Sequence, residues 1–226
     1  MKCKIVINTT KRFAPQTLPP LLESLSLAGF KKNEILIMSG GHSRRSRLLS
    51  NRNHLKLPFD GIDYTAFAAL AGNDFGSDYY FMMHDTTKAG KNFKEILFSI
   101  DPSPWEVIAL RNKPSMNIGL YSAQYLKQKA TLIEEIVTTD YSEESLHSLK
   151  VWNVENEDFV SWGQEQVSMT TYAELLACAN NGIPLILGKH DYYSNGVIRR
   201  VEYYKFLDFY KIKANWERRE RYELNL

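Results

Sequence analysis

Hydrophobic and polar residues alternate in blocks that predict a strand, a helix and a second strand in the first 40 residues. The run over 4–7 is short, apolar and rich in β-branched residues, which is typical of a buried strand. Leucines then recur at helical spacing between Thr17, a candidate N-cap followed by a proline pair, and Gly29. A second apolar strand is expected over 34–38. This order and spacing predict a βαβ unit with parallel strands.

The same patterns continue without an internal repeat or a clear linker. Further helices are expected over 63–71, 93–99, 123–136 (capped by Ser122), 141–150 and 171–180. Further strands are expected over 55–57, 79–83, 107–110, 183–187 and 197–206, before a short aromatic helix and a basic tail. We therefore predict one α/β domain over 1–226, a mostly parallel Rossmann-like sheet flanked by helices.

Composition narrows the class of protein. Hydrophobic residues make up 44% and charged residues 24% of the 226 residues, which excludes disordered, collagen-like and coiled-coil chains. The two cysteines, Cys3 and Cys178, cannot form a disulfide framework. No apolar run reaches the ~18 residues of a membrane span. We therefore expect a soluble, cytoplasmic protein without a transmembrane segment.

Charge is distributed unevenly along the chain. Residues 1–60 carry 11 basic against 3 acidic side chains, residues 61–198 carry 9 against 18, and residues 199–226 carry 8 against 5. A long polyanion needs a broad basic surface, so the acidic middle makes nucleic acid an unlikely partner. The distribution fits a small anionic ligand beside acidic groups, or charges that are merely solvated.

Three predicted strands end in small polar residues, over 8–12, 39–43 and 84–87. In parallel sheets, ligands bind outside the carboxyl ends of the strands. Asp85 follows a wholly apolar strand, and a carboxylate there can hold a divalent cation, with His84 as second ligand or donor. Alternatively, Asp85 caps the turn and His84 packs on the sheet. No GxGxxG follows the first strand and no P-loop motif occurs, which argues against those phosphate sites.

This layout resembles the GT-A fold glycosyltransferases, which transfer a sugar from a nucleotide-diphosphate donor. The resemblance covers roughly residues 1–125. It rests on the threonine-containing loop at 9–12, the Ser-Gly-Gly turn at 39–41, the small-residue helix at 66–72 and the triplet at 84–86. In that family the triplet is usually Asp-x-Asp, whereas this chain has His-Asp-Thr, with one carboxylate where two are usual. The resemblance implies a nucleotide-sugar part over 1–125, and an acceptor part with a C-terminal extension over 126–226.

The resemblance also assigns candidate residues. Those expected around the nucleotide-sugar are Thr9, Thr10, Arg12, Gly40, Gly41, Arg44, Asn117 and Gly119, of which the last two lie toward the acceptor. Asp85, His84 and the late His190 are the candidate ligands of a divalent cation, Mn²⁺ or Mg²⁺. Glu157 or Asp158 would be the catalytic base. Each also has an ordinary structural explanation: strand ends, solvated arginines, a strand-to-helix junction or an exposed acidic loop.

We therefore predict a metal-assisted glycosyltransferase that moves a sugar from a nucleotide-diphosphate donor to an acceptor hydroxyl of a glycan or other molecule. One alternative is a nucleotidyltransferase. Another is a catalytically degenerate GT-A-like protein that binds a partner. Tyrosines interleaved with basic residues after position 190 suit a glycan, a single-stranded nucleic acid or an anionic membrane surface, but equally a core with surface side chains or a subunit contact in a homo-oligomer.

Overall fold

The computed structural model describes residues 1–43, 53–59, 65–110, 118–138, 159–161, 167–170 and 198–214. They fall into two compact units that alternate along the sequence. Unit 1 lies within Met1–Pro15, Phe30–Asp85 and Phe98–Glu165, and unit 2 within Gln16–Gly29, Thr86–Leu97 and Gln166–Leu226. Each unit takes residues from both sides of position 125.

Unit 1 contains a seven-stranded sheet of order β3-β2-β1-β4-β7-β6-β8. Its strands are β1 (Cys3–Thr10), β2 (Ile35–Gly40), β3 (His54–Lys56), β4 (Tyr79–His84), β6 (Val107–Ala109), β7 (Gly119–Ser122) and β8 (Phe159–Ser161). The first four strands in this order are parallel, β7 is antiparallel to both of its neighbours, and β6 and β8 are parallel. The prediction of an α/β fold with a mostly parallel sheet is confirmed.

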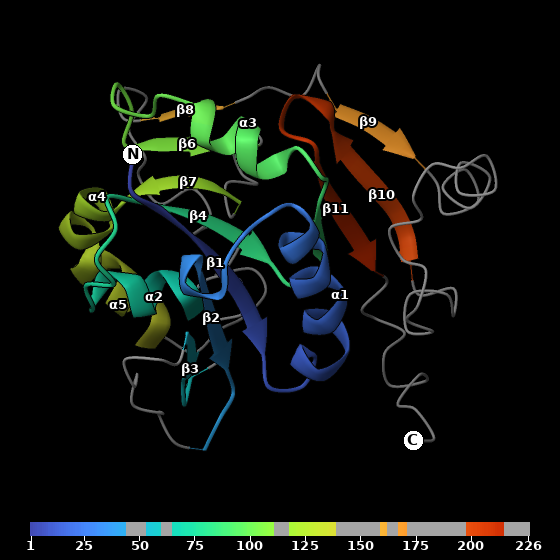
Figure 1. Cartoon of the computed structure of the whole chain (residues 1–226). Helices are drawn as coiled ribbons and strands as arrows, with labels where there is room; N and C mark the ends of the chain where they lie inside the picture. Colours follow the sequence, from blue (N-terminus) through green and yellow to red (C-terminus); the bar gives the residue numbers. More distant parts are fainter. Residues whose placement is uncertain are drawn as a thin grey trace, which may run out of the picture. The chain divides into compact units, whose positions relative to one another are not determined.

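Helices cover one face of this sheet and enclose the core of unit 1. They are α2 (Thr65–Ala71), α4 (Ala123–Gln128) and α5 (Ala130–Thr138), which lie together in Figure 1, and a 3₁₀ turn, η1 (Lys32–Glu34), precedes β2. Alternate strand residues such as Val6 and Met82 pack against them. The ring of Phe67 meets Tyr121 edge-on at 4.8 Å between centroids. Burial of this apolar face holds the helices on the sheet.

The predicted helix over 123–136 is instead two helices. Ser122 is the N-cap of the first, as predicted, because its hydroxyl accepts a hydrogen bond of 3.1 Å from the N–H of Tyr125. The first helix ends at Gln128, because the φ and ψ of Lys129, −91° and 9°, leave the helical region. The chain therefore changes direction between α4 and α5.

Unit 2 is built on a small antiparallel sheet of order β5-β11-β10-β9. Its elements are α1 (Ala14–Leu27), β5 (Thr87–Ala89), α3 (Phe93–Ser99), β9 (Val167–Thr170), β10 (Ile198–Tyr204), η3 (Lys205–Leu207) and β11 (Phe209–Ala214). Phe93 packs on Phe209 at 5.3 Å between ring centroids. Ser24 of α1 accepts a hydrogen bond from the N–H of Ala89 on the edge strand, which satisfies a group that the sheet leaves open.

Several elements of unit 2 differ from the predictions. The helix begins at Ala14, so Thr17 is not its cap but a fully buried residue within it, and Pro19 and Pro20 lie inside the helix instead of in its first turn. Strands β5 and β9 were not predicted, because they have only three and four residues, and residues 209–214 form strand β11 where a short aromatic helix and a tail were expected. The elements expected over 141–150, 171–180 and 183–187 lie outside the described residues.

Lys88 on β5 is a half-buried cation of unit 2. Burial lowers its pKa from the ordinary 10.5 to about 8, and the carboxylate of Glu23 opposes this only in part. The unfolded chain therefore holds more protons than the folded chain between these two pH values. The cost of burying the ammonium group is present below pH 8 and falls as the pH rises through that window.

Replacing Lys88 by methionine removes this cost. We expect the variant to be more stable than the wild type at pH 7, and the difference to shrink as the pH rises above about 8, because the wild-type amine then loses its charge. Thermal denaturation of both proteins at pH 7 and at pH 9.5 measures the effect, and the tyrosines that both proteins share cancel in the difference. A stability difference that is the same at both pH values would contradict the burial of a charged Lys88 side chain.

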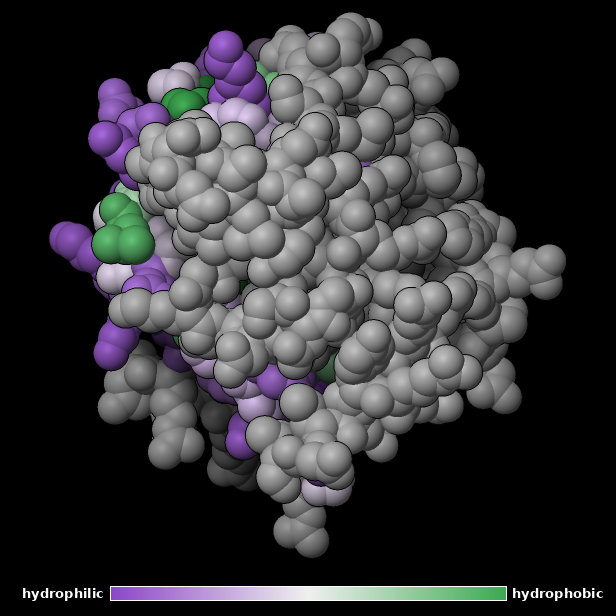
Figure 2. Space-filling view, turned by 90° about the vertical axis from the view of Figure 1, so that its right-hand side faces the viewer, coloured by the Kyte–Doolittle hydropathy of each residue, from purple (hydrophilic) through white to green (hydrophobic). Residues whose placement is uncertain are grey.

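The exposed surface of the described residues is mainly polar. Figure 2 shows one face on which these residues are mostly hydrophilic, with small hydrophobic areas. The large apolar side chains exposed among them are Met1, Leu27 and Phe98. None of the described helices combines the length and apolar character that crossing a bilayer requires.

Candidate functional site

The strand order of unit 1 reverses beside β1. After β1 the chain forms β2 and β3 on one side of it, and then places β4 on the other side. In open α/β sheets, ligands bind outside the carboxyl ends of the strands, at such a switch point in strand order. Residues at these two strand ends are the first place to look for a site.

Thr9 and Asp85 meet at this switch point. The Thr9 hydroxyl donates a hydrogen bond of 2.5 Å to Oδ2 of Asp85, although the two residues are 76 positions apart. The N–H of Asp85 donates to the carbonyl of Asn8 at 3.1 Å, which fixes the start of the loop after β4. Asp85 stays partly exposed while Thr9 is buried. The carboxylate is therefore held in place and still reaches solvent, as a ligand-binding group must.

Polar residues of β2 and β3 extend this site along the sheet. Ser39 is the register partner of both Thr9 and Lys56, so all three side chains point to one face. The Ser39 hydroxyl and Nε2 of His42 are joined by a hydrogen bond of 2.9 Å. The N–H of His42 donates to the carbonyl of Leu57 at 2.9 Å, which keeps the loop after β2 against β3. On this face, the hydroxyls of Thr9 and Ser39 lie between the ammonium group of Lys56 on β3 and the carboxylate that follows β4.

His54, two residues before Lys56 on β3, is a neutral side chain of this site. Burial lowers the pKa of His54, and the charges of Lys56 and His42 lower it further. Its Nε2 is buried without a hydrogen-bond partner among the described residues. The positive charge at this end of the site therefore comes from Lys56 and not from His54.

Comparisons with known proteins do not assign a family. No model of a known protein family matches this chain, and no curated protein matches it at a significant level. Its function must be argued from the residues and their geometry.

His84 lies on the other face of the sheet from the Thr9–Asp85 pair. His84 is the register partner of Asn8, and Asn8 Oδ1 accepts a hydrogen bond of 2.9 Å from the N–H of Ala66 at the start of α2. Consecutive strand residues point to opposite faces, so His84 is directed toward α2. His84 and Asp85, expected to be ligands of one cation, therefore lie on opposite faces of the sheet.

The remaining candidate residues at the ends of β1 and β2 make different kinds of contact. The N–H of Lys11 donates to the carbonyl of Gly40, and that of Gly41 donates to Phe59, so these backbone groups join the strand ends to one another. The Arg12 guanidinium lies 5.3 Å from the centre of the Phe13 ring. Thr10 has a buried hydroxyl oxygen with no hydrogen-bond partner in the described part of the chain. Thr10 is thus the one of these candidates whose hydroxyl still lacks a partner.

Gly119 has a structural reason of its own. A Cβ at this position would overlap the carbonyl oxygen of Ile108 and lie 2.8 Å from Cα of Ala109. The close neighbour of Gly119 is therefore the backbone of β6. Gly119, a candidate for the acceptor side, is therefore explained by the packing of β7 on β6.

Five candidates, Arg44, Asn117, Glu157, Asp158 and His190, lie outside the described residues. Within the described ranges, no group of three or more His, Cys, Asp or Glu side chains is placed to hold a metal ion. Asp85 is thus the candidate cation ligand that the described part of the site contains. The sequence did not predict Ser39 and Lys56 beside Thr9, because only the pairing register brings them onto one face, or His42, which joins them through its hydrogen bond to Ser39.

Proposed function

We propose that this chain is a GT-A-like glycosyltransferase that moves a sugar from a nucleotide-diphosphate donor to an acceptor hydroxyl. The donor would lie at the carboxyl edge of β1, β2 and β4. Asp85 would bind a divalent cation, Mn²⁺ or Mg²⁺, or the hydroxyls of the donor. Glu157 or Asp158 would act as the base.

The observation that supports this proposal most is the hydrogen bond between Thr9 and Asp85 at the switch point. It fixes a partly exposed carboxylate at the edge of the sheet where open α/β folds bind ligands. The hydroxyls of Thr9 and Ser39 and the ammonium group of Lys56 add polar groups on the same face. Donors of this kind suit an oxygen-rich, negatively charged ligand such as a diphosphate.

Calorimetric titration of the full chain with UDP and GDP, with and without Mn²⁺, tests the proposal. We expect one of the two nucleotides to bind with a Kd below about 1 mM, which corresponds to about −4 kcal/mol. ATP at the same concentrations is the comparison for nonspecific binding of a nucleotide. If neither UDP nor GDP binds at millimolar concentration, the proposal fails.

A second candidate is a GT-A-like protein that binds the nucleotide-sugar without transferring the sugar. It is favoured by the single carboxylate in the triplet and by the absence of a three-residue metal cluster within the described ranges. Under this alternative UDP or GDP binds equally well without Mn²⁺, and a nucleotide-sugar is not hydrolysed or transferred. Pyrophosphate released from a nucleoside triphosphate and a sugar phosphate would instead identify a nucleotidyltransferase.

A further inference from the structure

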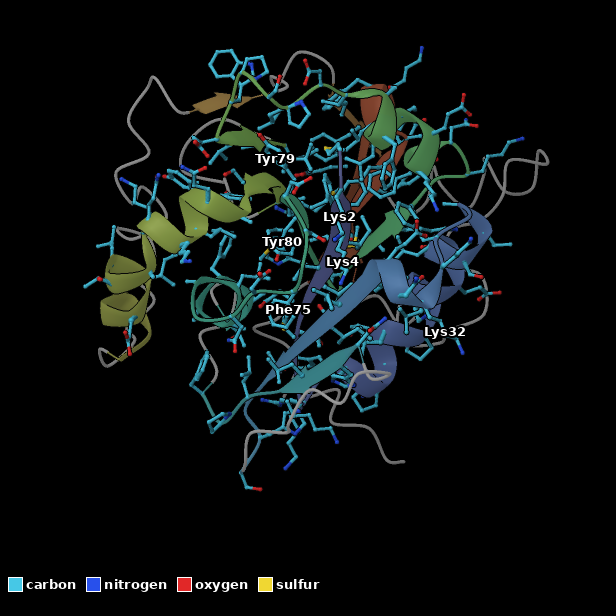
Figure 3. All side chains as sticks on the ribbon, turned by 60° about the vertical axis from the view of Figure 1, so that its left-hand side comes forward. Lys2, Lys4, Lys32, Phe75, Tyr79 and Tyr80 are labelled. Atoms are coloured by element: carbon cyan, nitrogen blue, oxygen red, sulfur yellow. The ribbon has the colours of Figure 1, made fainter. Side chains whose placement is uncertain are left out.

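Unit 1 has a cavity at the opposite edge of the large sheet, where β4 begins. Its volume is about 530 Å³, and it lies between the end of α2, the turn that leads into β4 and the start of α4. Figure 3 labels Phe75 and Tyr80 at this edge, beside Lys2 and Lys4. The polar side chains that line the cavity belong to Asn73, Asp74, Ser77, Tyr80, Gln124 and Lys127.

Two hydroxyl groups in this cavity have unused hydrogen-bonding capacity. Ser77 is 7% exposed, and its Oγ has no hydrogen-bond partner in the described part of the chain. The Tyr80 oxygen accepts hydrogen bonds from the backbone N–H of Phe75, at 3.3 Å, and of Ser77, so its own hydrogen remains to be donated. Burial also raises the pKa of Tyr80 and keeps that hydrogen in place. A buried hydroxyl without a partner is unfavourable, and a bound ligand relieves this.

The walls of the cavity are fixed by hydrogen bonds from elsewhere in unit 1. Lys4 Nζ donates to the carbonyl of Phe75 at 2.8 Å, and the N–H of Ala123 donates to the carbonyl of Asp78 at 2.8 Å. These bonds hold the turn before β4 to β1 and to α4. A ligand therefore meets a site that is already formed, and binding costs little ordering of the chain.

The lining indicates which ligand fits. Asp74 and Lys127 carry opposite charges, so the cavity has no excess charge to attract a simple anion or cation. The hydroxyl of Ser77 and the carboxamide of Gln124 can both donate and accept, and Tyr80 offers its hydrogen. The amide nitrogen of Asn73 already donates to the carbonyl of Ala69 at 2.7 Å. We propose that this cavity binds a neutral, polyhydroxylated ligand of the size of a monosaccharide or disaccharide. It is a site separate from the carboxyl edge of the sheet, and it does not depend on the proposed transfer reaction.

The test is an NMR titration of the ¹⁵N-labelled full chain with glucose, N-acetylglucosamine and maltose at up to about 100 mM, which detects millimolar affinities. We expect saturable shifts of the Ser77, Gly76 and Gln124 amides with at least one sugar. Inorganic phosphate is the parallel probe for a simple anion. Repeating the sugar titration with UDP present tests whether the sugar and the nucleotide bind at separate sites.

Two variants decide whether such shifts report this cavity. Ser77→Ala removes the buried hydroxyl, so we expect about a tenfold weaker affinity for the sugar but an unchanged or higher Tm. Gly72→Phe adds a bulky side chain to the lining of the cavity, and a Cβ there makes only an ordinary contact of 3.7 Å with the carbonyl oxygen of Ala68, so the variant should fold and lose binding. Absence of shifts with all three sugars, shifts with phosphate alone, or shifts that persist in both variants would overturn the proposal.

Discussion

The Asp85→Asn variant is expected to bind UDP or GDP about a hundredfold more weakly than the wild type in the presence of Mn²⁺. Asparagine keeps the size of the side chain and still accepts the hydrogen bond from Thr9, but it removes the negative charge at the switch point. A cation that bridges the protein and a diphosphate depends on that charge. Without Mn²⁺ the two proteins should bind the nucleotide about equally.

Asp78→Asn is the matched control for this prediction. Asp78 accepts a hydrogen bond from the backbone N–H of Lys2, before the start of β1 and at the other edge of the sheet. Its substitution should therefore leave nucleotide affinity unchanged. Thr9→Val should weaken binding by about tenfold, because it releases the carboxylate from its fixed position without removing the charge. Wild-type nucleotide affinity in the Asp85→Asn variant would show that Asp85 takes no part in binding at the switch point.

The Gly119→Ala variant should lose at least about 3 kcal/mol of unfolding free energy, or fail to fold. The residue has a φ of +155°, a conformation that residues with a Cβ rarely adopt. The new methyl group would also overlap the backbone of Ile108 and Ala109 on β6, which cannot rotate away as a side chain can. Since β7 joins β4 to β6, a shift at this point disturbs the centre of the sheet.

Urea denaturation followed by circular dichroism measures this loss, and Gly72→Ala is its control. Gly72 has no positive φ, and a Cβ there meets nothing closer than 3.7 Å. The control should therefore be as stable as the wild type, or up to about 1 kcal/mol more stable, because alanine restricts the unfolded chain. Equal stability of Gly119→Ala and the wild type would show that β6 and β7 are not packed as closely as described.

Much of the fold follows from short apolar runs that end at glycine or at polar residues. The helix over 93–99 and the cap at Ser122 were predicted as the structure has them. The start of α1 was not, because proline is expected near a helix N-terminus, whereas here Pro19 and Pro20 follow a first turn that contains Ala14. Short strands such as β5 carry too few residues for a period to be visible, and only pairing with β11 defines them.

The sequence predicted the position of site residues only where they stand at the ends of predicted strands. Thr9 and Asp85 follow apolar runs of parallel strands, whose carboxyl ends must lie at one edge, and the structure brings these two residues together. Which side chains share a face depends on register, so the sequence alone did not separate His84 from Asp85 or place Ser39 beside Thr9. Whether these residues bind a nucleotide-sugar stays a prediction.

The alternation of the two units along the chain has a consequence for synthesis. Strand β5 pairs with β11, and this pairing joins Ala89 to Phe209 across more than half of the sequence. While the ribosome is still translating the middle of the message, β5 has no partner strand, and its apolar neighbours stay exposed to chaperones and proteases. No single cut can separate the two units into intact halves, and unit 2 cannot complete its sheet before residues 198–214 have been synthesised, whereas unit 1 needs no residue beyond Glu165.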